Sequence, residues 1–191
     1  MNYRYIFFAS TFAIFSCTFN KGEKAENHSR NAKENTSNLY GDQTTSTARI
    51  NSFDTTVTVL FWDTTDSIGE IQKKNLQEFV VKQDSLFPSI LNAIFEEYKK
   101  GYSAYKEGWT TIGKISDEEL EKHLPKPTTA DNLKAFITPG VLHVQNKKDC
   151  KLGTIGIEFD CTWDIENGLG VMIENWKVVK AGVAEASYFL K

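Results

Sequence analysis

Apolar and polar residues alternate with a period of two in two parts of the chain, residues 55–62 and 154–164. Such alternation predicts β-strands that place one row of side chains against a core and the other row toward water. Glu158 and Asp160 fall in the second row, so we expect both on a solvated face. The inward rows are Val57, Val59 and Phe61 in the first strand, and Ile155, Ile157, Phe159, Cys161 and Trp163 in the second.

A hairpin is predicted at the end of the second strand. Residues 164–168, DIENG, end in Asn-Gly, a pair that adopts left-handed backbone angles at little cost. Residues 169–173 then return as the partner strand, and after a turn at ENW residues 177–183 form a third, which completes a β-meander. The candidate turn or binding residues of this hairpin are Trp163, Asp164, Glu166, Asn167, Gly168 and Gly170.

The middle of the chain has helical periodicity. The clearest helix is predicted over residues 85–102, where aliphatic and aromatic side chains recur every three or four positions. Asp84 or Ser85 can cap it and Pro88 falls in its first turn, so we expect it to be separate from a helix over residues 67–83. Shorter elements are predicted as a helix over 116–124 with Ser116 and Glu119 as a capping box, a helix over 129–137, and a strand over 138–144.

Together these elements predict a single α+β domain over residues 51–191. Its antiparallel sheet ends in the C-terminal β-meander, and two or three helices pack on one face. Cys150 and Cys161 would lie about 20 Å apart at the spacing of strand residues, whereas a disulfide needs Cα atoms within about 7 Å. We therefore expect Cys161 to be a buried, unreactive thiol.

The first 16 residues predict a signal peptide, because Arg4 precedes an apolar run that ends in IFSC. Ile14, Ser16 and Cys17 resemble a bacterial lipobox, although Phe15 stands where a small residue is usual. The resemblance implies cleavage before Cys17 and a diacylglycerol on its thiol. Residues 17–50 are polar and predict a disordered tether. These features favour the cell envelope, with the protein held on a membrane outside the cytoplasm; the alternatives are an ordinary signal peptide with a chance cysteine and an apolar helix that stays attached.

Charge and motifs exclude several functions. The net charge is −3 and the basic residues are scattered, so no nucleic-acid partner is expected. The three histidines are far apart, and neither H-E-x-x-H nor C-x-x-C occurs, so no metal or other cofactor is expected. Residues 108–115, GWTTIGKI, approach a P-loop, but Ile115 replaces the hydroxyl that binds magnesium. This segment is better interpreted as a loop or strand with a packed Trp109.

The C-terminal hairpin resembles a bacterial domain family of unknown function. Members of that family carry Gly-hydrophobic-x-Phe-x-Cys-x-Trp-Asp-x-Glu-His-Gly-x-Gly-Val, which IGIEFDCTWDIENGLGV follows here except that Asn167 replaces the histidine. The helical residues 72–98 and the segment 133–144 are also similar, so the likeness covers about residues 52–189. It implies the fold, and it brings no known activity.

The sequence favours a non-catalytic binding module with a protein partner. An exported chain with a well-defined core and no convergent catalytic set is typical of such proteins, and some similar small domains resemble immunity proteins of toxin systems. No catalytic residue is assigned. The alternative is an envelope hydrolase that uses Asp164 and Glu166 as paired carboxylates.

Overall fold

The computed structural model describes residues 44–62, 67–112, 115–145, 148 and 150–188. The chain divides into two compact units, residues 1–35 and 36–191, and every described residue belongs to the second. The predicted signal peptide, Cys17 and the tether as far as residue 43 lie outside the described residues.

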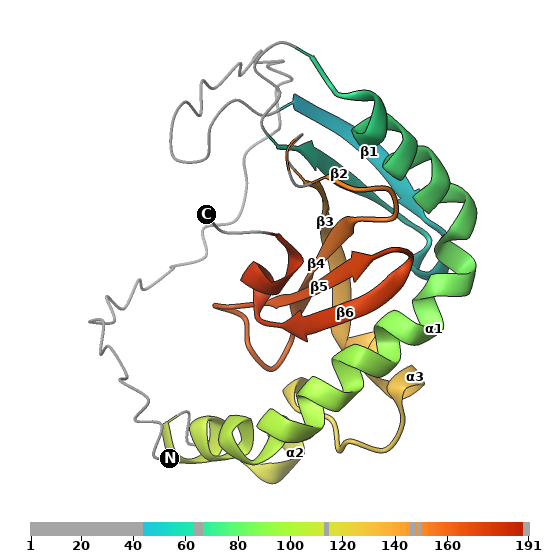
Figure 1. Cartoon of the computed structure of the whole chain (residues 1–191). Helices are drawn as coiled ribbons and strands as arrows, with labels where there is room; N and C mark the ends of the chain where they lie inside the picture. Colours follow the sequence, from blue (N-terminus) through green and yellow to red (C-terminus); the bar gives the residue numbers. More distant parts are fainter. Residues whose placement is uncertain (1–43, 63–66, 113–114, 146–147, 149, 189–191) are drawn as a thin grey trace, which may run out of the picture. The chain divides into compact units, whose positions relative to one another are not determined.

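A six-stranded sheet with the strand order β1-β2-β3-β4-β5-β6 forms the centre of the second unit (Figure 1). Neighbouring strands are antiparallel except β2 and β3, which run parallel. The connection between these two strands contains the three α-helices and returns the chain to the end of the sheet at which β2 begins. The expected α+β class and the C-terminal meander, β4 to β6, are confirmed. The strands are β1 (Thr44–Ile50), β2 (Thr55–Phe61), β3 (Ile137–Val144), β4 (Ile155–Cys161), β5 (Leu169–Glu174) and β6 (Lys177–Gly182).

The prediction of two separate helices before and after residue 84 is wrong, because α1 (Glu70–Glu107) is one helix of 38 residues. The hydroxyl of Ser85 does not cap a helix; it donates to the carbonyl of Lys82, one turn back, at 2.7 Å. Pro88 lies inside the helix, where a proline costs about 3 kcal/mol. Buried apolar side chains on both sides of Pro88, each worth about 1.5–3 kcal/mol, offset that cost. They include Phe79, Leu86, Phe87, Ile90, Ile94 and Tyr98.

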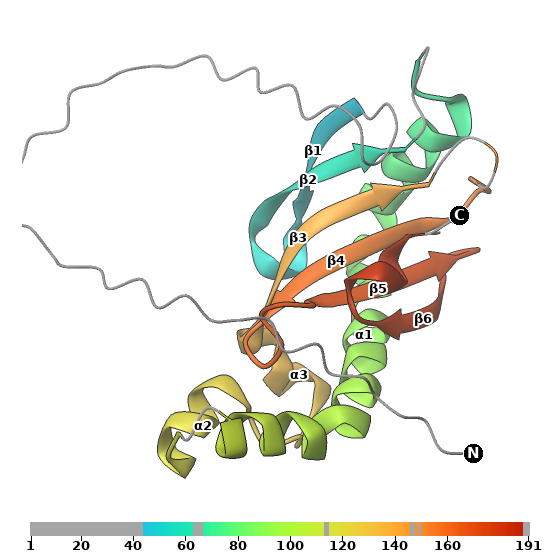
Figure 2. The same cartoon turned by 90° about the vertical axis from the view of Figure 1, so that its left-hand side faces the viewer.

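The shorter helices lie at the end of the sheet where β3 begins, while α1 passes behind the sheet (Figure 2). Ser116 caps α2 as predicted, since its hydroxyl accepts the N–H of Glu119 at 3.3 Å. The loop or strand expected at residue 108 is instead a π-helical turn that continues α1. The two short α-helices are α2 (Asp117–His123) and α3 (Ala130–Leu133). The other short elements of the domain are η1 (Asn51–Phe53), η2 (Gly108–Ile112), η3 (Lys134–Phe136) and η4 (Ala184–Ser187).

The domain begins before residue 51. Residues 44–50, assigned to the tether on composition, form the edge strand β1, whose Ala48 and Ile50 are buried. The threonines and serine of this segment look polar in sequence, but they suit a strand whose outer side chains are exposed. The disordered tether predicted for residues 17–50 is therefore corrected at its C-terminal end.

Three amide side chains of α1 fasten the helix to the ends of the strands. Gln72 donates to the carbonyls of Trp62 and Gln145, both at 2.9 Å. Asn75 is fully buried; its nitrogen donates to two backbone carbonyls and to the sulfur of Cys150, and its oxygen accepts the N–H of Gly153. Gln83 donates to the carbonyl of Arg49 at 3.1 Å. Polar residues in the buried stripe of α1 thus satisfy backbone groups that the sheet leaves unpaired.

The predicted outward row of β4 is only partly solvated. Residues 183–188, here called the C-terminal strap, include η4 and lie on the sheet face opposite α1 (Figure 2). A Cβ at Gly156 would stand 1.6 Å from the carbonyl oxygen of Ser187, so the strap touches the strand backbone. Gly156 is therefore buried. In the same row Thr154 is also buried and Glu158 is half-buried, whereas Asp160 is exposed as expected. The inward row is buried from Ile155 to Trp163, which confirms that part of the pattern.

Candidate functional site

The hairpin residues singled out in the sequence mainly build a turn. One carboxylate oxygen of Asp164 accepts the backbone N–H of Asn167 at 3.3 Å and its side-chain N–H at 2.7 Å. The carbonyl of Asp164 accepts the N–H of Gly168 at 2.9 Å. Gly168 alone in this turn has a positive φ, 57°. The expectation of left-handed angles at Asn167 is thus wrong, and paired left-handed residues occur instead in the β5–β6 turn, at Asn175 and Trp176.

The two glycines after the turn permit close backbone contacts. A Cβ at Gly168 would lie 2.9 Å from the carbonyl oxygen of Phe159, and one at Gly170 would lie 2.4 Å from that of Ala184 in the strap. Real Cβ atoms do not approach backbone oxygens so closely, so both positions require glycine for packing. Their presence therefore follows from the fold and does not indicate a ligand.

Asp164 and Glu166 line neither the hollow beside Pro125 and Phe136 nor the one beside Leu86 and Trp176. Asp164 is half-buried and engaged in the turn, and Glu166 is exposed. A general acid in sugar hydrolysis depends on burial to hold its proton. The hydrolase alternative stays a prediction that no feature of the described residues favours.

Trp163 belongs to an aromatic cluster under the C-terminal half of α1. Its ring centroid lies 4.4 Å from that of Tyr98, and its indole N–H has no hydrogen-bond partner among the described residues. Beside it, burial raises the pKa of the Cys161 thiol to about 12. The thiol donates a hydrogen bond to the carbonyl of Asp164, 3.4 Å from Sγ. Burial, and then the nearby carboxylate of Asp164, raise the pKa of Tyr105 to about 12. Cys150 and Cys161 are both buried free thiols.

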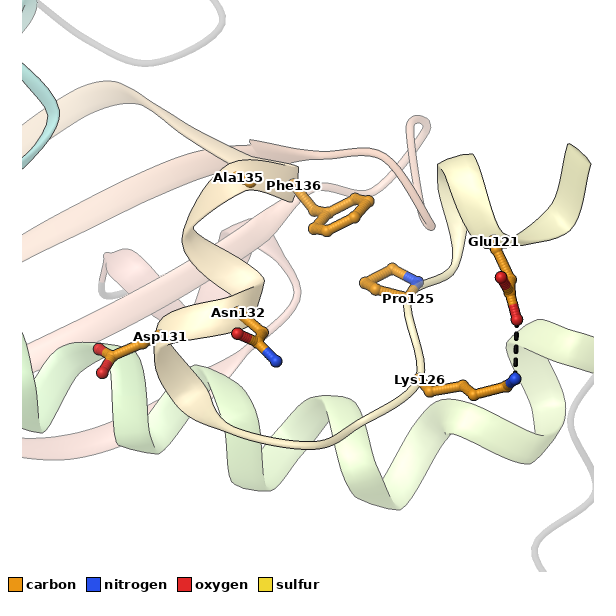
Figure 3. Close-up of a pocket in the computed structure, with 7 residues that line it drawn as sticks. All are labelled: Glu121, Pro125, Lys126, Asp131, Asn132, Ala135 and Phe136. Carbon is orange, nitrogen blue, oxygen red and sulfur yellow. Dashed lines mark ion pairs between the residues drawn. The ribbon is translucent and has the colours of Figure 1, made fainter. Parts of the chain in front are cut away.

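An open hollow of about 580 Å³ lies next to this cluster, between the segment that follows α2 and the α3–η3 segment (Figure 3). The rings of Pro125 and Phe136 face each other across it. The side chain of Asn132 points inward, that of Asp131 points away, and an ion pair of 2.7 Å between Glu121 and Lys126 borders the opposite side. The described residues that line it are Glu121, Pro125, Lys126, Asp131, Asn132, Ala135 and Phe136.

The residue between Cys161 and Trp163 holds both walls of the hollow. The backbone N–H of Thr162 donates to the carbonyl of Phe136 at 3.0 Å, on the η3 wall. The hydroxyl of Thr162 donates to the carbonyl of His123 at 2.7 Å, on the α2 wall. One residue therefore fixes the spacing between two segments that are 13 positions apart in the chain.

Aromatic contacts reinforce the same walls. Trp109 stacks on His123 with ring centroids 5.0 Å apart and donates its indole N–H to the carbonyl of Trp163 at 3.1 Å. Tyr98, which packs on Trp163, donates its hydroxyl to the carbonyl of Pro125. The segment near residue 162 thus anchors the hollow through hydrogen bonds and ring contacts. Sequence analysis selected the neighbouring acids and missed this role, because no local pattern brings residues 121–136 to the hairpin.

A second polar cluster that sequence analysis missed joins β2, β3 and β4. The imidazole of His143 accepts the indole N–H of Trp62 at Nδ1, 3.1 Å away, and its Nε2 lies 2.9 Å from a carboxylate oxygen of Glu158. With Nδ1 accepting, the ring proton resides on Nε2 and is donated to Glu158. The ring of Tyr188 lies 5.0 Å from that of His143. Both ring nitrogens are thus used within the fold.

In the ranges that the structure describes, no three His, Cys, Asp or Glu side chains gather as ligands of a metal ion. Among the described helices none is both long enough and apolar enough to cross a bilayer.

The family of this chain follows from its similarity to known sequences. Neither the curated proteins nor the solved structures gave a match. The model of a family described as a domain of unknown function, DUF6985, matches residues 31–189. The match starts 20 residues before the domain boundary predicted from composition, in keeping with the position of β1. Because it covers most of the sequence, the chain belongs to the DUF6985 family.

Proposed function

We propose that this protein is a non-catalytic binding module for a protein partner, carried on a lipid-anchored N-terminus at the cell envelope. The partner contacts the hollow between Pro125 and Phe136. An immunity-like protein, which binds a toxin, is one member of this class.

The observation that carries the proposal is the clamping of both walls of the hollow by Thr162. The hydrogen bonds to Phe136 and His123 fix the hollow before any partner arrives, and a preformed site loses less entropy on binding than a mobile one. Its centre is apolar and its border polar, which is the usual arrangement in a protein interface. An apolar side chain of the partner fits between the two rings, and Asn132 supplies hydrogen-bonding groups beside it.

Filling the hollow tests the binding site. Ala135 is exposed at its border, so Ala135→Arg blocks the space without replacing a core residue. Ala104→Arg, on an exposed position of α1, is the matched control. The full-length variants are crosslinked in the producing cells and purified. We expect at least one protein that is recovered with wild type and Ala104→Arg and is lost with Ala135→Arg. If every recovered protein is also recovered with Ala135→Arg, the hollow is not the binding site.

The anchor has its own test. Cys17→Ala removes the thiol that the lipid requires, so we expect the variant to leave the membrane fraction when cells are fractionated, whereas wild type stays in it. Membrane association equal to that of wild type would overturn the lipid anchor and leave the binding proposal intact.

A further inference from the structure

The end of the C-terminal strap lies against a buried histidine of the sheet. His143 of β3 is 3% exposed. The ring of Tyr188, in the strap, lies 5.0 Å from the imidazole of His143 and is stacked on the indole of Trp62, 5.5 Å away. Close by, Gln145 donates to the carbonyl of Ser187 at 3.1 Å. The position of the strap end therefore depends on two rings that are hydrogen-bonded to each other.

The hydrogen bond between these two rings requires a neutral imidazole. An indole N–H can only donate, so the bond of 3.1 Å from Trp62 needs an Nδ1 of His143 that carries no proton. A proton on Nδ1 would set two N–H groups against each other, and the indole could not keep its place. The bond of 2.9 Å between Nε2 and Glu158 suits both states, since a charged imidazole donates more strongly to a carboxylate. Protonation thus breaks one bond of His143 and strengthens the other.

The charges around the imidazole favour its protonation. Of the described groups in hydrogen-bond or ring contact with His143, which are an indole, a phenol and the carboxylate of Glu158, only the carboxylate is charged at neutral pH. Strand β2 has no charged residue and β3 has no other. Asp160 of β4 and Glu185 of the strap are exposed and negative, like Glu158. Negative charge favours the protonated ring, whereas burial and the bond from the indole favour the neutral one.

We propose that His143 is a pH-sensitive latch for the end of the strap. At neutral pH its Nδ1 holds the indole of Trp62 under the ring of Tyr188. In mild acid, in the range of about pH 8 to 5 where imidazoles gain a proton, the proton on Nδ1 displaces the indole, and Tyr188 loses the ring on which it is stacked. The bond to Glu158 keeps the imidazole in place, so the sheet stays folded.

Loosening of the strap end uncovers part of the sheet. The carbonyl oxygen of Ser187 stands over Gly156 of β4, on the face opposite α1 (Figure 2). When Tyr188 is released, this backbone contact is the next to open, and the face of β4 at Gly156 becomes accessible. The latch does not depend on the hollow, and failure of either proposal leaves the other standing.

The indole N–H of Trp62 reports the latch directly. The purified full-length chain is labelled with ¹⁵N-tryptophan, and its four indole resonances are followed by NMR from about pH 8 to 5. Trp62→Phe identifies the signal by its loss. We expect the Trp62 signal to shift through one transition in wild type and to stay constant in His143→Asn, whose oxygen still accepts from the indole but takes up no proton. A constant wild-type signal, or an equal shift in folded His143→Asn, would overturn the proposal.

Hydrogen exchange follows the strap itself. Exchange of the peptide that contains residues 183–188 is measured by mass spectrometry near pH 7.5 and near pH 5.5, with labelling times scaled for the pH dependence of chemical exchange. We expect scaled exchange in wild type to be at least threefold faster near pH 5.5. His123→Gln changes a histidine of α2 and is the matched control, which should show the same acceleration.

Replacing the carboxylate provides a variant that keeps the histidine. Glu158→Gln removes the charge that favours the protonated ring, so the acceleration should need a lower pH than in wild type. Thermal melts show which variants are folded. Strap exchange in wild type that is equal at the two pH values, an acceleration lost in folded His123→Gln, or one that occurs at an unchanged pH in folded Glu158→Gln would each refute the latch at His143.

Discussion

Gly156→Ala tests how closely the C-terminal strap packs on the sheet. The added methyl would overlap the carbonyl oxygen of Ser187, which stands 1.6 Å from the ideal Cβ position. The carbonyl oxygen is part of the backbone and the new methyl group is bonded directly to Cα, so no side-chain rotation relieves the clash. The strap must therefore move away from β4. Ala186 and Ser187, which are 3% and 0% exposed, then become accessible to water.

The expected loss of stability in Gly156→Ala follows from the contacts that the strap loses. The strap is held by a hydrogen bond from Gln145 to the carbonyl of Ser187 and by one from the N–H of Ala184 to the carbonyl of Asn167, both 3.1 Å long. Each contributes about 1 kcal/mol net, and overpacking adds about 1–3 kcal/mol. We expect the free energy of unfolding to fall by about 3–5 kcal/mol. A shift of roughly 2–4 °C in Tm accompanies each kcal/mol for a domain of this size.

Gly182→Ala is the control, because its added Cβ would meet only the Cβ of Ala186, at an ordinary 3.5 Å. We expect this variant to be as stable as wild type, or up to about 1 kcal/mol more stable through a less flexible unfolded chain. Guanidinium unfolding followed by circular dichroism measures both variants. The reasoning is refuted if Gly156→Ala stays within about 0.5 kcal/mol of wild type, or if Gly182→Ala is destabilised as much.

Four further outcomes are expected. Asn75→Ala should lower the free energy of unfolding by about 2 kcal/mol or more, since the carbonyl of Thr154 and the N–H of Gly153 lose the hydrogen bonds that Asn75 makes with them; a loss below 1 kcal/mol in thermal melts would contradict this. Tyr105 has a folded pKa of about 12, above its ordinary value of 10.0, so its contribution to stability is complete below pH 10 and is lost as the pH rises toward 12. Tyr105→Phe should therefore flatten the fall in denaturation midpoint between pH 9 and 11, and an unchanged slope would count against the raised pKa. Cys161, with a thiol pKa of about 12, should resist maleimide at pH 8 in the native protein and react after denaturation, as peptide mapping shows; fast native labelling would contradict its burial. Asp164→Asn combined with Glu166→Gln should leave the chain folded and its partner recovered; a hydrolytic activity that disappears in this folded double variant would instead establish the hydrolase alternative.

Local sequence patterns predicted a helix or strand correctly where the contacts of that element are within itself or with a single core. The alternation from Ile155 to Trp163 identified β4 and its inward row, because that row packs on a single core. The capping pair at Ser116 identified the start of α2, because a cap is satisfied within one turn. The break expected before Pro88 was wrong, since burial on both sides of the proline outweighs its local cost.

The candidate site was less predictable for a physical reason. Asp164 and Glu166 were candidates from the sequence because two neighbouring carboxylates can act together in hydrolysis. In the structure Asp164 is hydrogen-bonded within the turn and Glu166 is exposed. Thr162 was not a candidate, because its hydrogen bonds to His123 and Phe136 join segments that are distant in the chain. Such contacts have no periodicity, so no single stretch of sequence carries them.

The sequence by itself determined the α+β class, the meander and the buried row of β4, because these depend on neighbouring residues and on one hydrophobic face. Only the tertiary structure decided that residues 44–50 belong to the sheet and that Gly156 is covered by the strap. It also decided that Thr162 fixes the walls of the hollow. Each of these depends on which distant segment lies against a residue, and that is set by the packing of the whole chain.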